Sequence, residues 1–414
     1  YYTDAANRSR AYGAYLNNQR PLKAVNISIT QGVFDDNFWV GLGILTKGSV
    51  KLNTISASGN DIPAAPDWQI YGMDIDADDG SGSVTLTSTL GDSHFDDNDG
   101  SGIRIFAKGT VSLSGKVDGN SSSSSNGTGS TGYGISVDNT AGSGAVTIKN
   151  FDIVSNQNSG LRIRSYGAIT LDTLDVNNNG VGAESTGAEI ANDSAPTTKA
   201  VIINSSSFQG NHGDGLLVYT KGSVTLNGIT ASGNTSGTSN PSGAIIDASY
   251  GSGTVTFLGT KGANSFFNND GSGLTIFAKG KVSLDSLTAY NNANNYGVYV
   301  STNTAGDVIV KKLTSYNNGY AGLHIAAFGN ITVDNTILYG NGLVSTLDSG
   351  AYLYNAGGSL AKFVTVTRSS FYNTPSWGLE VDSRGLITIN KISAYDNTSG
   401  GGAWLVNNYA GATA

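Results

Sequence analysis

The 414-residue chain repeats one short motif from end to end: a glycine, an apolar residue, any residue and a second apolar residue. The motif occurs fifteen times, about every 28 residues. Its glycines are Gly13, Gly41, Gly72, Gly102, Gly134, Gly160, Gly187, Gly215, Gly243, Gly273, Gly297, Gly322, Gly350, Gly378 and Gly402. Repetition at this period predicts a solenoid, in which each winding buries its apolar face against its neighbours.

The residues after each glycine alternate between apolar and polar, as in residues 102–105, Gly-Ile-Arg-Ile. A second alternating segment follows in each repeat, with apolar pairs such as Val111/Leu113, and a third segment, such as residues 287–289, completes the winding. Alternation with period two is strand geometry, and no helical periodicity interrupts it. We therefore expect an all-β, right-handed parallel β-helix of about fourteen coils, with three short strands per coil and no capping helix.

An asparagine recurs at a fixed distance after the second segment of the coils. The set is Asn37, Asn60, Asn156, Asn179, Asn211, Asn234, Asn292, Asn318, Asn341 and Asn397, and Asn98, Asn120 and Asn269 hold the equivalent corner where insertions change the count. Asparagine tolerates the left-handed backbone of a sharp corner, and its amide can bond to the asparagine of the next coil. We expect a structural asparagine ladder.

Five tyrosines occupy the same outward position of the third segment on consecutive coils: Tyr290, Tyr316, Tyr339, Tyr372 and Tyr395. We call this set the tyrosine stripe. Stacked tyrosines can simply stabilise neighbouring strands. A stripe of aromatic side chains is also suited to binding a glycan or to lateral contact with another chain. Both roles are left open by the sequence.

The composition excludes several classes of function. A net charge of −8, with 13% charged residues, disfavours nucleic-acid binding, which needs a basic stripe. The absence of cysteine rules out disulfides and thiolate metal sites, and no apolar run predicts insertion into a membrane. The Ser/Thr/Asn/Gly-rich composition favours an extracellular or cell-surface location. We expect no cofactor and no metal.

Residues 1–414 read as one continuous domain, because the repeat never stops. Both ends are cut in mid-coil: residues 1–7 resemble a third strand, and residues 402–414 resemble a first strand and its turn. An open end exposes unpaired ladder groups. We therefore expect either a segment of a longer chain or self-association, end to end or laterally.

Charged side chains offer several candidate catalytic groups. Asp74 beside Arg104, and Arg162 beside Glu189, fall in one outward column and could supply the acid and the arginine of a polysaccharide lyase, or form cross-strand ion pairs. Residues 74–80 (Asp-Ile-Asp-Ala-Asp-Asp-Gly) resemble a calcium loop, but the glycine falls one residue late and no glutamate follows. A solvated acidic turn is the preferred interpretation.

Adjacent aspartates at residues 35–36 and 96–97 resemble those of a glycosidase, but they fall at the corner where polar turn residues are expected. The three histidines, His94, His212 and His324, have no plausible nucleophile beside them in the pattern. No catalytic residue is assigned from the sequence.

The glycine motif, the second segments such as Val111-Ser112-Leu113 and the corner asparagines together resemble the right-handed parallel β-helix, or pectate-lyase-like, superfamily. The resemblance extends over the whole chain and is closest in character to repetitive bacterial surface and adhesin-type proteins. It implies a non-catalytic extracellular rod, a segment or subunit of a fibre, filament, sheath or adhesin. The alternatives are a carbohydrate-active β-helix enzyme, either a polysaccharide lyase or a hydrolase, and a glycan-binding module with polysaccharide as its partner.

Overall fold

The structure is a computed structural model that describes residues 2–4, 7–10, 12–20, 23–61, 70–117, 122–127, 132–181, 185–304, 306–345, 347–357 and 361–407. It is an all-β parallel solenoid of about fourteen turns, as the alternation predicts, and the described residues form no helix. None of the described segments is thus an apolar helix of membrane-spanning length. The contacts divide the chain into two units: unit 1, residues 1–202 and 206–212, and unit 2, residues 203–205 and 213–414.

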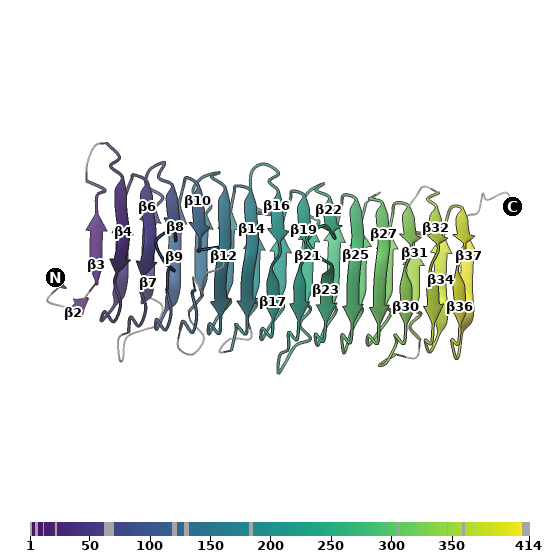
Figure 1. Cartoon of the computed structure of the whole chain (residues 1–414). Helices are drawn as coiled ribbons and strands as arrows, with labels where there is room; N and C mark the ends of the chain where they lie inside the picture. The colour runs from purple at the N-terminus through teal and green to yellow at the C-terminus, as the bar shows by residue number, and fades with distance from the viewer. Residues whose placement is uncertain are drawn as a thin grey trace. The chain divides into compact units, whose positions relative to one another are not determined.

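Each unit contains two parallel sheets whose successive strands lie side by side (Figure 1). The strands that follow the repeated glycines form the glycine-strand sheet. In unit 1 they are β3 Ala14–Asn17, β5 Val40–Leu45, β7 Tyr71–Ala77, β9 Ser101–Ala107, β11 Ile135–Asn139, β13 Leu161–Ser165 and β15 Ala188–Ala191. In unit 2 they are β18 Leu216–Tyr219, β21 Ala244–Ala248, β24 Leu274–Ala278, β26 Val298–Thr302, β28 Leu323–Ala327, β31 Ala351–Tyr354, β34 Trp377–Ser383 and β37 Gly401–Asn407.

The expected second and third strands of each coil share the other sheet, which we call the ladder sheet. In unit 1 its strands are β4 Ile27–Val33, β6 Val50–Ser56, β8 Val84–Thr87, β10 Val111–Ser114, β12 Val146–Val154, β14 Ile169–Asn177 and β17 Ser207–Gln209, and β16 Val201–Asn204 has residues in both units. In unit 2 they are β19 Val224–Asn227, β20 Thr230–Ser232, β22 Val255–Leu258, β23 Asn264–Phe267, β25 Val282–Tyr290, β27 Val308–Tyr316, β29 Ile331–Asp334, β30 Ile337–Tyr339, β32 Val364–Thr367, β33 Ser370–Tyr372, β35 Ile387–Asn390 and β36 Ser393–Tyr395.

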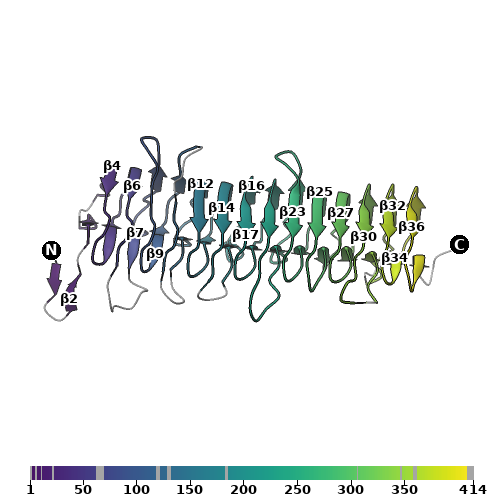
Figure 2. The ribbon, with the colours of Figure 1, turned by 60° about the horizontal axis from the view of Figure 1, so that its bottom comes forward.

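In six coils the second and third segments form one continuous strand: β4, β6, β12, β14, β25 and β27. Each of these strands bends at one residue with positive φ, for example Asn150 at 54° and Ser286 at 59°. A single left-handed residue reorients the backbone without ending the sheet. Figure 2 shows the same coils turned, with the connecting turns coming forward.

Alternation places the apolar side chains of both sheets inside each coil. Ile103 and Ile105 of β9, and Val111 and Leu113 of β10, are fully buried, as is Phe95, which precedes β9 in the sequence. The partner of each inward residue in the next coil is again inward, because the register is preserved from coil to coil. The apolar core therefore continues through every coil of a unit, and outward side chains stand in columns.

Asparagines at the corner hydrogen-bond from coil to coil. In unit 1 the chain of side-chain bonds runs from Asn37 through Asn60, Asn98, Asn126, Asn156 and Asn179 to Asn211. In unit 2 it runs from Asn234 through Asn269, Asn292 and Asn318 to Asn341, and Thr374 bonds to Asn397 in the same way. Asn120 lies outside the described residues; Asn126 occupies its expected place.

The repeated glycine is required by this ladder. A Cβ atom added to Gly273 would lie 2.7 Å from the Asn292 side-chain nitrogen and 2.6 Å from the Gly297 carbonyl oxygen. Both distances are shorter than real Cβ contacts, so only glycine lets the strand approach the neighbouring amide. The two sequence signatures are thus parts of one packing arrangement.

The N-terminal segment differs from the expected third strand. β1 (Tyr2–Asp4) and β2 (Asn7–Arg10) pair with each other in antiparallel fashion. At the other end, β37 forms the expected first strand, and residues 408–414 lie outside the described part.

Candidate functional site

A file of aromatic side chains stands on the outer surface of the glycine-strand sheet of unit 2. Tyr299, His324 and Tyr352 are register neighbours on β26, β28 and β31. The His324 ring lies 5.1 Å from Tyr299 and 5.0 Å from Tyr352, measured between ring centroids. Strand alternation turns all three side chains outward, and parallel pairing stacks them one coil apart.

Two further tyrosines, which precede the repeated glycines of their coils, enclose this file. Tyr296 lies 4.9 Å from His324 and 5.3 Å from Tyr299, and its ring meets Tyr320 at 5.4 Å. With Tyr354, which contacts Tyr352 at 6.3 Å, these side chains form what we call the aromatic face: Tyr296, Tyr299, Tyr320, His324, Tyr352 and Tyr354. The angles between contacting rings range from 30° to 88°, so the rings do not cover one another completely.

Three ring side chains of the aromatic face, His324, Tyr296 and Tyr352, are uncharged at neutral pH. Burial lowers the pKa of His324 to about 4, so its imidazole is neutral. Burial, with Asp348 and the neighbouring tyrosines, raises the pKa of Tyr296 to about 12. Burial also raises the pKa of Tyr352, helped by Glu380 and Asp382. The phenols of Tyr296 and Tyr352 therefore keep their protons and can donate hydrogen bonds.

Carboxylates border this face. Glu380 on β34 is the register neighbour of Tyr352, and its Oε2 accepts a 2.7 Å hydrogen bond from Ser349 Oγ. Asp382 follows two residues later on the same strand, so both side chains point outward. Glu380 lies opposite Trp404 of β37, whose side chain is exposed. Rings and carboxylates on one surface are what a sugar-binding or sugar-cleaving site requires.

A cavity of about 250 Å³ lies beside the aromatic face, also within unit 2. It is lined by Asp247, Ser249, Phe277, Ala278, Ser301 and Asn303. Phe277 connects the two features, because its ring meets Tyr299 edge to face at 6.0 Å.

Unit 1 carries the arginine–carboxylate pairs expected from the sequence. Arg104 Nε and Nη2 donate to Asp74 at 2.9 and 2.7 Å, and Nη1 donates to the Tyr71 hydroxyl at 2.7 Å. The guanidinium also lies over the Tyr71 ring, 3.9 Å from its centre. Arg162 faces Glu189 at 3.7 Å. Because the Arg104 guanidinium donates its hydrogen bonds to Asp74 and Tyr71 on the neighbouring strand, we assign it a structural role that links β7 and β9.

The acidic turn that follows Asp74 contains one perturbed carboxyl. Burial, followed by the neighbouring Asp78, raises the pKa of Asp76 to about 6. Among the described residues, no group of three or more His, Cys, Asp or Glu side chains is arranged to hold a metal ion.

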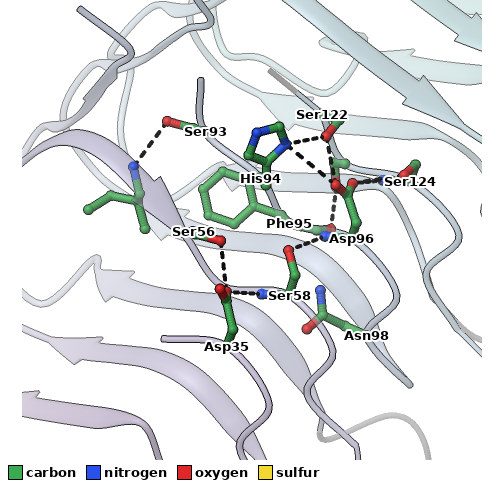
Figure 3. A network of polar contacts seen from close by, with 12 residues as sticks. Asp35, Ser56, Ser58, Ser93, His94, Phe95, Asp96, Asn98, Ser122 and Ser124 are labelled. Atoms are coloured by element: carbon green, nitrogen blue, oxygen red, sulfur yellow. Dashed lines mark hydrogen bonds and ion pairs between the residues drawn. The ribbon is translucent and has the colours of Figure 1, made fainter. Parts of the chain in front are cut away.

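The aspartates that resemble a glycosidase pair act as acceptors on the ladder sheet of unit 1 (Figure 3). Asp35 Oδ1 accepts from Ser56 Oγ at 2.7 Å and from the Ser58 N–H at 2.8 Å. Asp96 accepts from Ser122 Oγ at 2.7 Å and from the Ser124 N–H and Oγ, each at 2.8 Å. Their sequence neighbours, Asp36 and Asp97, sit at the corner with positive φ. These carboxylates fasten adjacent coils together.

His94 belongs to the same network. Its Nδ1 lies 3.0 Å from Ser122 Oγ and 3.6 Å from Asp96 Oδ2 (Figure 3). In a nucleophilic triad the acid and the nucleophile contact opposite ring nitrogens. Here one nitrogen faces both groups, so Ser122 is not activated as a nucleophile. The remaining histidine, His212, lies at the corner after Asn211, as expected. Its backbone N–H donates to the Asn179 carbonyl oxygen.

The tyrosine stripe lies on the ladder sheet of unit 2 and is preceded by Phe267. The six rings stack face to face with centroids 4.8 to 5.2 Å apart and planes within 6° of parallel. Each internal ring therefore covers the faces of its neighbours and leaves its edge and hydroxyl exposed. Glycan binding or lateral contact at the stripe stays a prediction.

Comparison with known proteins supports the fold. Residues 186–360 match the family model described as "Right handed beta helix region". With the parallel register of both sheets, this match confirms the expected right-handed parallel β-helix. No curated protein matches the sequence.

The solved structures that resemble the chain include two that act on polysaccharides by their names. One is the A-module of a mannuronan C-5 epimerase from Azotobacter vinelandii, with 12% identity, a TM-score of 0.41 and coverage of 89% of this chain and 91% of that one. The other is a pectate lyase, with 13% identity, a TM-score of 0.38 and coverage of 76% and 70%. At these identities the likeness concerns the fold alone.

The predicted function requires correction. The sequence led us to expect a non-catalytic structural rod and no enzymatic activity, and this was wrong: the two solved structures named above are enzymes by their names. The alternative, a carbohydrate-active β-helix enzyme, is the better supported interpretation. No sequence motif marks the aromatic face, because its members come from separate coils and two of them, Tyr296 and Tyr320, precede the glycines.

Proposed function

We propose that this protein is a carbohydrate-active enzyme that hydrolyses an uncharged polysaccharide on the aromatic face of unit 2. The observation that carries the proposal is the continuous file of Tyr299, His324 and Tyr352 with Glu380 as its next member. Aromatic rings pack against the apolar C–H faces of sugars, and carboxylates accept hydrogen bonds from sugar hydroxyls.

The charged groups near the aromatic face favour one class of polysaccharide substrate. The charged groups that act on Tyr296 and Tyr352 are all carboxylates: Asp348, Glu380 and Asp382. Their field would oppose an anionic glycan, since like charges brought together at an interface cost several kcal/mol. Elimination from a uronic acid also needs a positive group to neutralise the sugar carboxylate. The aromatic face thus favours a hydrolase of neutral glycans over a lyase.

The chemistry would come from Glu380 and Asp382. Alternate residues on a strand have Cα atoms roughly 6.6 Å apart. On one face of a strand, side chains that start from this Cα spacing can hold their carboxyl groups at the ~6.5–9.5 Å of inverting glycosidases, where a water molecule fits between sugar and base. One carboxyl would protonate the glycosidic oxygen as its bond to the anomeric carbon breaks. The other would take a proton from the water that attacks that carbon.

The neutral groups of the aromatic face would bind and orient the sugar. Tyr352 lies between His324 and Glu380 in the file, so its phenol can donate to a sugar oxygen next to the carboxylates. The His324 ring, which is neutral and lies among tyrosines, adds apolar surface for the sugar to pack against. An enzyme of polysaccharides meets its substrate outside the cell, so we also infer an extracellular location.

The test is the release of new reducing ends from neutral polysaccharides by the full chain. Glu380→Gln should abolish the release while leaving the fold intact, because glutamine can still accept from Ser349. Glu189→Gln is the matched control, since Glu189 is an outward glutamate of the same kind of sheet, paired with Arg162 in unit 1. Full activity of Glu380→Gln, or no release by the wild-type protein from any neutral polysaccharide, would refute the proposal.

The tyrosine stripe is proposed as a second contact surface for polysaccharide or for another chain. The regular row of exposed ring edges and hydroxyls, one per coil, supports this role. Replacing all five tyrosines by serine should weaken retention on insoluble polysaccharide or reduce self-association. If neither changes, the stripe serves the fold alone.

A further inference from the structure

The cavity beside the aromatic face is formed by a second outward file of the glycine-strand sheet. Asp247, Phe277 and Ser301 are register neighbours on β21, β24 and β26. They lie two residues further along their strands than the file that contains Tyr299. The cavity and the aromatic face are therefore adjacent columns of one sheet surface.

The walls of the cavity combine one aromatic ring with polar groups. The Phe277 side chain is 38% exposed, so part of its ring is available to a ligand. Asp247 Oδ1 accepts from the Ser249 N–H at 2.9 Å and from Ser249 Oγ at 2.6 Å. These two bonds fix the carboxylate and leave Oδ2 for another donor. The Ser301 hydroxyl and the Asn303 amide complete the lining.

We propose that this cavity binds one uncharged sugar unit, the terminal or branch unit of a polysaccharide. A sugar ring needs an apolar face for its C–H groups and polar partners for its hydroxyls, and the cavity offers one aromatic ring and four polar side chains. The volume of about 250 Å³ is below the ~300–1,000 Å³ typical of pockets for larger ligands, so one ring fits rather than several. The Asp247 carboxylate would oppose a uronate in the same place.

This inference rests on the proposed function only in placing the main chain of the same polysaccharide on the aromatic face. The Phe277–Tyr299 ring contact is the physical link between the two surfaces. A branch unit in the cavity would then fix the position of the main chain relative to Glu380. Branched substrates should be bound more tightly than linear ones of equal length.

Binding can be measured without catalysis. The full chain carrying Glu380→Gln would be titrated calorimetrically with neutral hexasaccharides, linear and singly branched, and with an oligogalacturonate of the same length. Phe277→Ala should weaken binding of the branched neutral hexasaccharide about tenfold. Ser301→Phe, which fills the cavity from an outward position, should abolish the preference for the branch.

The control is Phe328→Ala, because Phe328 is another phenylalanine of unit 2 with the same 38% exposure that does not line the cavity. Equal affinities of the Phe277 and Phe328 variants, or an unchanged branch preference in Ser301→Phe, would overturn the inference. Binding of the oligogalacturonate as tight as that of the neutral sugars would overturn its charge argument. Branch-selective binding by a wild-type protein that releases no reducing ends would refute only the hydrolase.

Discussion

His324 and Tyr352 occupy equivalent outward positions on adjacent strands of unit 2, and their rings meet edge to face, 5.0 Å apart and at 88°. The contact places an imidazole where water would otherwise solvate its charged form. Protonation of His324 is therefore opposed by the same packing that builds the aromatic face.

Acid should destabilise the fold through His324. The pKa is about 4 when folded and 6.5 in the reference state, so the unfolded chain binds the proton more readily. The stability contributed by neutral His324 is complete above pH 6.5 and is lost progressively as the pH falls to 4, by up to about 3 kcal/mol. Urea unfolding of wild type and His324→Phe at pH 7 and pH 4 measures the difference. Equal losses in the two proteins would contradict the assignment.

Removing one amide from the ladder should be costly. Asn318 Nδ2 donates to Asn341 Oδ1 at 2.8 Å, and Asn318 Oδ1 accepts from Asn292 Nδ2 at 2.8 Å. Asn318→Ala leaves buried partners unsatisfied, so we expect a loss of roughly 2–3 kcal/mol in the free energy of unfolding. Asn294→Ala, at an exposed turn, should change it by less than about 0.5 kcal/mol. A thermal or urea melt of both variants decides the matter.

The contribution of each tyrosine of the stripe to the free energy of unfolding should depend on its position in the stack. Tyr316 stacks on Tyr290 and Tyr339, whereas Tyr395 stacks on Tyr372 and is 49% exposed. Aromatic pairs contribute about 0.5–1.5 kcal/mol each beyond buried area. Tyr316→Ser should therefore destabilise unit 2 about twice as much as Tyr395→Ser. Similar unfolding free energies for the two variants would show that the stacked contacts contribute little.

Arg104 should matter for stability and not for catalysis. Arg104→Ala removes the paired hydrogen bonds to Asp74 and the contact with Tyr71. Charge-assisted hydrogen bonds of this kind contribute about 1.5–3 kcal/mol in favourable settings, and partial exposure of both side chains places the expected loss near the lower end. Release of reducing ends should remain at the wild-type rate. A loss of turnover with an unchanged melting curve would move the catalytic site to unit 1.

The fold was accessible from the sequence because its signals are local and repeated. A repeated glycine marks the place where a strand comes close to a neighbouring amide, and alternation marks which side chains face inward. Both signals can be recognised without knowing which distant residues are in contact. Where an insertion intervenes, spacing fails: the serine-rich segment before Asn126 made Asn120 the expected corner residue. At the position held by Thr374, a hydroxyl replaces the amide and no asparagine marks the coil.

The aromatic face could be predicted only in part from the sequence. The glycine motif assigns Tyr299, His324 and Tyr352 to one outward column, but Tyr296 and Tyr320 lie before their glycines, outside the alternation. Whether they turn back onto His324 depends on the path of the turns between coils. The shift in the His324 pKa depends on how deeply these turns bury the ring, and the sequence pattern alone does not give that burial.

The parallel rings of the tyrosine stripe have a practical consequence. Identical chromophores held a strand spacing apart couple their electronic transitions, and the coupling vanishes once the backbone no longer sets their distance. The part of the circular dichroism that arises from this coupling should therefore report the melting of unit 2, with no label attached.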